Sequence, residues 1–160
     1  MQRPHSRYCA ILLTNPWILF WAVLVSPALA GDTLLEPEQA FVISARLVSD
    51  TQLEVAYRIA PGYYLYRDKL DFRIEPASMR LGEPRLPPGR WHEDEFFGRS
   101  EIYRERLTVR IPLHGAEDYD RFRLVAVSQG CADVGVCFLP IEQSVRITRG
   151  GLPGLGAPQP

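Results

Sequence analysis

The sequence has 160 residues, of which 46% are hydrophobic and 23% are charged. Its 18 basic and 19 acidic residues give a formal net charge of −1, and the basic residues form no run. This balance argues against nucleic acid or an anionic lipid surface as the partner of the protein. The chain is also long enough to bury a hydrophobic core without needing a disulfide to fold.

The N-terminal segment has the three parts of a secretory signal peptide. Arg3 and Arg7 precede an apolar stretch over about 11–25, and small residues follow and end at Ala30. We expect cleavage after Ala30, so that residues 1–30 are absent from the exported protein. An uncleaved membrane anchor is the alternative, if the bilayer tolerated the polar residue and the proline inside the stretch. Cleavage would leave 16 basic residues against 19 acidic ones and a mildly acidic domain.

Hydrophobic and polar residues alternate through much of the remaining chain. Leu53, Val55, Tyr57 and Ile59 are separated by Glu54 and other small or polar residues, which predicts a strand with one buried and one wet face. The same period of two predicts strands over 41–47, 53–59, 107–113, 121–127 and 144–148.

Segments that break regular structure separate these predicted strands. They include 60–62, 86–89 and 114–118, and no window shows a helical period over three turns. The sequence therefore predicts an all-β domain over 31–148, an immunoglobulin-like antiparallel β-sandwich, with a small barrel as the competing architecture. The Gly- and Pro-rich residues 149–160 are expected to form a flexible tail or linker.

After removal of the leader, Cys131 and Cys137 are the only cysteines left. They follow a predicted strand, and Gly130 and Gly135 permit the tight backbone that would bring them together across a turn. So short a loop stabilises the fold by only about 2 kcal/mol on the chain-entropy model. From the residues alone, a structural disulfide and a redox-active pair both remain open.

A metal site is disfavoured by the spacing of these cysteines. The gap between Cys131 and Cys137 is wider than the spacing of zinc knuckles, and only His92 and His114 are left as nitrogen ligands. We therefore expect no metal and no cofactor other than a disulfide.

Two adjacent aromatic residues stand in a polar loop within 91–107. Phe96 and Phe97 lie between acidic residues and Gly98. Either the rings enter the core, or one of them covers a pair of sulfur atoms and excludes stray thiols.

Three blocks, 63–70, 91–107 and 129–140, together resemble the N-terminal periplasmic domain of the thiol:disulfide interchange protein DsbD. They read YYLYRDKL, WHEDEFFGRSEIYRERL and QGCADVGVCFLP, and they occur in the family's order. The cysteine block is the most specific, because both cysteines, their spacing and the residues between them fit together.

This resemblance implies an immunoglobulin-like fold in which Cys131 and Cys137 are the redox pair. It implies that Cys137 forms the mixed disulfide with the downstream partner and that Phe96 is the ring that shields the disulfide. Val136 and Leu139 depart from the family pattern, since they replace an aromatic residue and a proline. The other residues implied at the cap and around the site are Asp94, Glu95, Phe97, Gly98, Tyr64, Tyr66 and Asp133.

The sequence gives neither thiol an activating neighbour. Neither cysteine begins a helix or stands beside a lysine, features that lower a thiol pKa. By the resemblance, Asp94, Glu95 and Asp133 disfavour a further negative charge nearby. We therefore expect a sluggish pair that reacts only when a partner docks and displaces Phe96.

The resemblance also implies the partners and the compartment. It implies a monomeric periplasmic domain that takes electrons from a membrane-embedded thiol transporter. These electrons would pass to oxidised thioredoxin-fold proteins, such as a disulfide isomerase or a cytochrome c maturation thioredoxin. The chain would then be either part of a longer transporter or a free-standing version of this domain. The competing hypothesis is a non-catalytic periplasmic β-sandwich, a binding or chaperone-like module with a structural disulfide.

Overall fold

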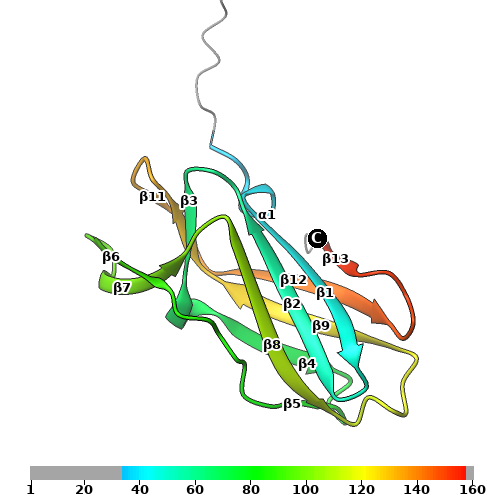
Figure 1. Ribbon diagram of the computed structural model, residues 1–160. Helices are drawn as coiled ribbons and strands as arrows, with labels where there is room; N and C mark the ends of the chain where they lie inside the picture. Colours follow the sequence, from blue (N-terminus) through cyan, green and yellow to red (C-terminus); the bar gives the residue numbers. More distant parts are fainter. Residues whose placement is uncertain (1–33, 158–160) are drawn as a thin grey trace, which may run out of the picture. The chain divides into compact units, whose positions relative to one another are not determined.

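The computed structural model describes residues 34–157, which form antiparallel strands with very little helix (Figure 1). The predicted signal peptide lies outside the described residues. Within 34–157, no helix is both long enough and apolar enough to cross a bilayer.

The elements follow one another closely along the chain. A one-turn helix, α1 (Pro37–Ala40), opens the described part, and a 3-10 turn, η1 (Arg67–Lys69), follows the third strand. The strands are β1 (Phe41–Ser49), β2 (Gln52–Ile59), β3 (Tyr63–Tyr66), β4 (Asp71–Glu75), β5 (Arg80–Leu81), β6 (Arg90–Asp94), β7 (Gly98–Tyr103), β8 (Arg106–His114), β9 (Arg121–Ser128), β10 (Gly130–Ala132), β11 (Val136–Cys137), β12 (Ile141–Thr148) and β13 (Gly154–Ala157).

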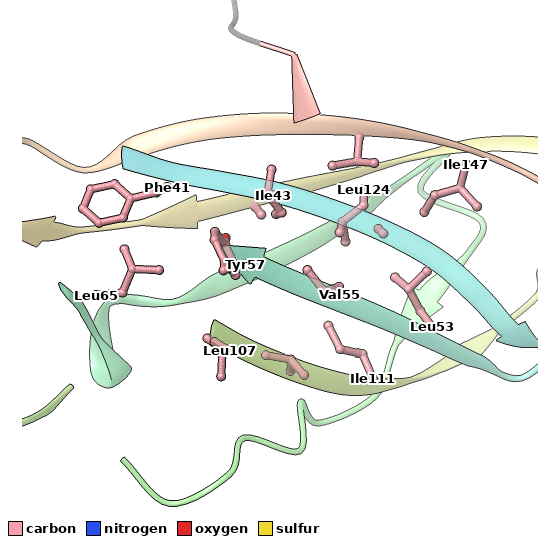
Figure 2. Close-up of a cluster of buried hydrophobic side chains, with 14 of the residues drawn as sticks. Phe41, Ile43, Leu53, Val55, Tyr57, Leu65, Leu107, Ile111, Leu124 and Ile147 are labelled. Carbon is pink, nitrogen blue, oxygen red and sulfur yellow. The ribbon is translucent and has the colours of Figure 1, made fainter. Parts of the chain in front are cut away.

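The larger sheet has the strand order β4-β9-β12-β13-β1-β2-β8-β5. Its core packs side chains of the β1-β2-β8 half against side chains of β9 and β12 (Figure 2). Ile43, Val55 and Leu107 come from the first half, and Leu124 and Ile147 from the second; all are almost fully buried. Alternate residues along each strand supply this core, so the predicted period of two and the predicted immunoglobulin-like β-sandwich are confirmed.

The smaller sheet has the order β11-β10-β3-β7-β6 and carries the cysteines. All four residues of β3 are buried because its two faces pack against different clusters. Tyr63 and Leu65 belong to the main core, whereas Tyr64 and Tyr66 belong to a second cluster that contains Cys131. A strand buried on both faces lacks the alternation that marks a half-buried strand.

Part of the C-terminal segment forms a strand. Residues 154–157, which lie within the predicted tail over 149–160, form β13, and this strand pairs with both β1 and β12. A Cβ atom at Gly154 would lie 2.1 Å from the carbonyl oxygen of Arg146, and only glycine fits so close to the neighbouring strand. The glycine content that suggested a linker instead permits backbone pairing.

Candidate redox site

The two cysteines face each other across a short hairpin. Cys131 in β10 lies directly opposite Cys137 in β11, and a disulfide joins them. Gly135 makes the turn with a φ of +86°, a conformation that glycine adopts without strain. Gly130 has a different role: a Cβ atom there would lie 2.2 Å from the carbonyl oxygen of Tyr64, so β10 approaches β3 too closely for a side chain. The hairpin expected from the sequence is therefore confirmed.

The two sulfur-bearing residues differ in their exposure to solvent. Cys131 is 1% exposed and belongs to a buried cluster, whereas Cys137 is partly exposed and lies in β11, at the edge of the smaller sheet. An incoming thiol can therefore reach Cys137 more readily than Cys131.

The hydroxyl of Tyr66 lies beside the disulfide. It is 3.1 Å from Sγ of Cys131 and 3.9 Å from Sγ of Cys137, and it donates a hydrogen bond to Oδ2 of Asp94 at 2.7 Å. Burial, followed by the hydrogen bonds with Asp94 and Tyr64, raises the pKa of Tyr66 well above its usual range. The phenol is therefore neutral at every physiological pH.

Asp94 is the last residue of β6 and the acceptor around which the loop folds. Its Oδ1 accepts hydrogen bonds from the backbone amides of Phe96 and Phe97 at 2.9 and 2.8 Å. Its Oδ2 accepts from Tyr66, and the hydroxyl of Tyr64 lies 3.4 Å away. Desolvation raises the pKa of Asp94, but these hydrogen bonds and the nearby His92 outweigh it and leave the pKa lowered. Asp94 is thus a carboxylate at neutral pH.

The loop between β6 and β7 brings the ring of Phe97 onto Tyr66. The Phe97 ring packs edge-on against Tyr66 with 4.7 Å between centroids, and Nζ of Lys69 lies 4.7 Å from the Phe97 ring centre. Phe96 is 46% exposed, and no ring contact involves it within residues 34–157. Phe97 thus packs against Tyr66, while the shielding role of Phe96 stays a prediction. Gly98 closes the loop with a φ of +63°.

Arg104 neutralises one of the acidic residues named from the sequence. Its guanidinium donates two hydrogen bonds to Asp133, at 3.0 and 2.8 Å, and lies 4.9 Å from the ring centre of Tyr64. The Asp133 carboxylate is therefore paired and adds less negative charge to the site than expected. Glu95 is exposed, and its side chain makes no hydrogen bond or ion pair within 34–157.

Three residues near the site were not among those named for it from the sequence. They are Lys69, His92 and Arg104, which come from η1, β6 and the residue after β7. His92 packs against Tyr64 with 4.8 Å between ring centres, and its Nε2 is 3.8 Å from Oδ2 of Asp94. The alternation of β6 places His92 and Asp94 on one face and could have indicated His92. No pattern in the neighbouring sequence indicated Lys69 or Arg104.

Comparisons with known protein families give one match over most of the chain. The family described as "Thiol:disulfide interchange protein DsbD, N-terminal" matches residues 31–149. This range contains the disulfide, the loop after Asp94 and the site tyrosines.

Curated relatives are named thiol:disulfide interchange proteins. The chain is 39% identical over 140 residues to a thiol:disulfide interchange protein DsbD of Ralstonia nicotianae, covering 87% of this chain and 22% of that protein. It is 38% identical over 123 residues to DsbD of Escherichia coli, covering 77% of this chain and 21% of that protein. The chain thus spans about a fifth of the length of the curated relatives that it matches.

Solved structures agree with these matches. The reduced N-terminal domain of DsbD from Neisseria meningitidis superposes with a TM-score of 0.69 at 39% identity, covering 78% of this chain and 96% of that one. A complex between the DsbD and PilB N-terminal domains from the same organism contains a chain with a TM-score of 0.62 at 37% identity, covering 81% of this chain and 97% of that one.

Proposed function

The chain belongs to the family of DsbD N-terminal domains, and on this basis we propose that it is a thiol:disulfide oxidoreductase domain whose Cys131–Cys137 disulfide opens and closes in each cycle. The observation that carries the proposal is the asymmetry of the pair. Cys137 is partly exposed at a sheet edge, while Cys131 is buried beside the Tyr66 hydroxyl. Exchange through one reachable sulfur and one buried resolving sulfur fits this arrangement.

In the proposed cycle the reduced domain acts as a protein-disulfide reductase. The thiolate of Cys137 attacks the disulfide of the acceptor, which forms a mixed disulfide and releases one acceptor thiolate. Cys131 then loses its proton and attacks Sγ of Cys137, which reforms the intramolecular disulfide and releases the second acceptor thiolate. Two electrons pass to the acceptor in total, and its two thiolates take up the protons that Cys137 and Cys131 released on ionising. A donor dithiol restores the reduced pair by the reverse exchange.

The proposed donor is a membrane-embedded thiol transporter, and the proposed acceptors are thioredoxin-fold proteins of the periplasm. The resemblance in residues 91–107 and 129–140 supports these partners. The relative from Neisseria meningitidis, whose structure includes the PilB N-terminal domain, supports a protein as the exchange partner. Export by the N-terminal leader is part of this proposal.

Two single-cysteine variants test the proposal and serve as controls for each other. Reduced Cys131→Ala, mixed with an oxidised thioredoxin-fold acceptor, should accumulate a mixed disulfide through Cys137, because the resolving thiol is missing. Cys137→Ala should form none and should transfer no electrons. Mass spectrometry of the adduct identifies the linked cysteine.

Two outcomes would contradict the proposal. Trapping through Cys131 would reverse the two roles. A wild-type disulfide that fails to exchange with thioredoxin-fold dithiols, together with no adduct from either variant, would support a structural disulfide in a non-catalytic binding module.

A further inference from the structure

Tyr66 has one hydroxyl proton, and Oδ2 of Asp94 and the two cysteine sulfurs are the contacts that could accept it. Oδ2 of Asp94 is 2.7 Å from the hydroxyl and carries negative charge, whereas Sγ of Cys131 is 3.1 Å away and sulfur is a weak acceptor. The proton therefore goes to Asp94. The Tyr66 oxygen is then left as a hydrogen-bond acceptor next to Cys131.

Asp94 cannot reverse this hydrogen bond at neutral pH. As a carboxylate it has no proton to give, and the amides of Phe96 and Phe97 occupy its other oxygen. The loop backbone thus fixes the orientation of the carboxylate, and the carboxylate fixes the direction of the Tyr66 O–H.

We infer that the Asp94–Tyr66 pair holds Cys131 as the protonated thiol whenever the disulfide is open, so that Cys137 carries the negative charge during exchange. In the reduced domain, the S–H of Cys131 can donate to the Tyr66 oxygen, and a hydrogen bond to the neutral form stabilises that form. Tyr66 then contacts a reacting atom directly, and Asp94 is a positioning residue that acts through Tyr66. The inference rests on the proposed function and adds which of the two cysteines carries the proton in the reduced domain.

The inference accounts for both half-reactions. When a donor thiolate attacks Sγ of Cys137, the sulfur–sulfur bond breaks and its electron pair goes to Sγ of Cys131. That sulfur takes up the proton that the donor thiol released on ionising. When the domain later reduces an acceptor, Cys131 must give up the same proton before it can attack Cys137. The Asp94–Tyr66 pair opposes a bare thiolate at Cys131 in both directions.

Other charges around the pair do not act through the Tyr66 hydroxyl. Arg104 is engaged with Asp133, and Lys69 lies over the ring of Phe97. Within residues 34–157, the Tyr66 hydroxyl contacts Asp94, the two cysteine sulfurs and the neighbouring Tyr64, which is itself uncharged. The titratable and charged groups around Tyr66 and Asp94 are Tyr64, Lys69, His92, Glu95, Arg104 and Asp133.

The substitution Asp94→Asn should invert the hydrogen bond. The two backbone amides need an oxygen acceptor, so the asparagine carbonyl stays with them and its NH2 group takes the place of Oδ2. The NH2 group donates to the Tyr66 oxygen, and the Tyr66 O–H is free to donate to Cys131. Glu95→Gln is the matched control, because it removes the same charge from the same loop without touching Tyr66.

The measurement is the pH at which Cys131 ionises in the exported Cys137→Ala variant, followed by NMR of the labelled cysteine Cβ. This experiment involves no exchange partner, so its failure is distinct from a failure of the trapping experiment above. We expect ionisation above the pH of about 8.5 that is typical of a free cysteine. Adding Asp94→Asn should lower this pH by about one unit, a tenfold change in thiolate population, and Glu95→Gln should lower it much less.

A further variant separates hydrogen bonding from charge. With Tyr66→Phe present, Asp94→Asn and Glu95→Gln should shift the ionisation of Cys131 by similar small amounts, because the hydroxyl that transmits the effect is gone. The inference is overturned if Cys131 ionises at or below the typical pH. It is also overturned if Asp94→Asn matches Glu95→Gln while Tyr66 is present, or if its effect survives Tyr66→Phe. Circular dichroism establishes that each variant is folded.

Discussion

The two loop phenylalanines can be separated by their contacts, and we expect Phe97→Ala to cost more stability than Phe96→Ala. Their exposed fractions are similar, 38% and 46%, so hydrophobic area alone predicts similar losses. Only Phe97 packs against Tyr66 and lies beneath the ammonium of Lys69. An aromatic pair is worth about 0.5–1.5 kcal/mol and an exposed cation–π contact about 0.5–1 kcal/mol.

The expected difference in the free energy of unfolding is therefore about 1–2.5 kcal/mol. For a domain of this size it corresponds to a difference in Tm of roughly 3–10 °C. Thermal unfolding of the wild type and of both variants, as oxidised proteins in the same buffer, measures it. Equal Tm values for the two variants, or a lower Tm for Phe96→Ala, would refute the argument from these contacts.

The same two variants test whether Phe96 shields the disulfide. If it does, Phe96→Ala should speed reduction by a small dithiol and change the Tm little, because a ring on the surface contributes less than the roughly 3–5 kcal/mol of a core phenylalanine. Exchange with the cognate partner should change less, since docking displaces the ring in any case. A large fall in Tm with an unchanged reduction rate would instead identify Phe96 as a core side chain.

Three further perturbations follow from the geometry of the site. Gly130→Ala should prevent β10 from pairing with β3, because the added methyl group meets the Tyr64 carbonyl; loss of the folded near-ultraviolet spectrum would show it, and a native spectrum would contradict it. The lowered pKa of Asp94 stabilises the fold above the unfolded pKa of about 3.9, and this contribution is lost as the pH falls through the folded pKa. The free energy of unfolding should therefore fall less steeply with decreasing pH in Asp94→Asn than in the wild type. Identical acid-unfolding curves for the two proteins would argue against it. Arg104→Gln should change stability by less than about 1 kcal/mol, because the ion pair with Asp133 is exposed. It should nevertheless slow exchange with a thioredoxin-fold acceptor, since the Asp133 carboxylate is left unpaired. Adding Asp133→Asn to this variant should restore the exchange rate.

The sequence was sufficient for the properties that depend on near neighbours along the chain. Alternation with period two depends only on which face of a strand is buried, and it predicted β1, β2, β8, β9 and β12. The hairpin of Cys131 and Cys137 was predictable as well, since a sequence separation of six with a glycine near the turn leaves few other ways to join the two sulfurs. Local pattern failed for β3, which is buried on both faces, and for β13, whose glycines resemble a linker.

The tertiary structure alone decided which side chains meet at the disulfide. Tyr66 lies 28 residues from Asp94 and 65 residues from Cys131 in the chain, and their contacts depend on the pairing of β3 with β7 and β10 and of β6 with β7. The same pairings bring Arg104 to Asp133. No pattern within one segment encodes such distances, because strand register is set by the joint burial of all the strands. Thus the sequence determined that a disulfide forms in a β-sandwich. The folded chain determined which of its two sulfurs is buried beside Tyr66, the tyrosine whose hydroxyl donates a hydrogen bond to Asp94.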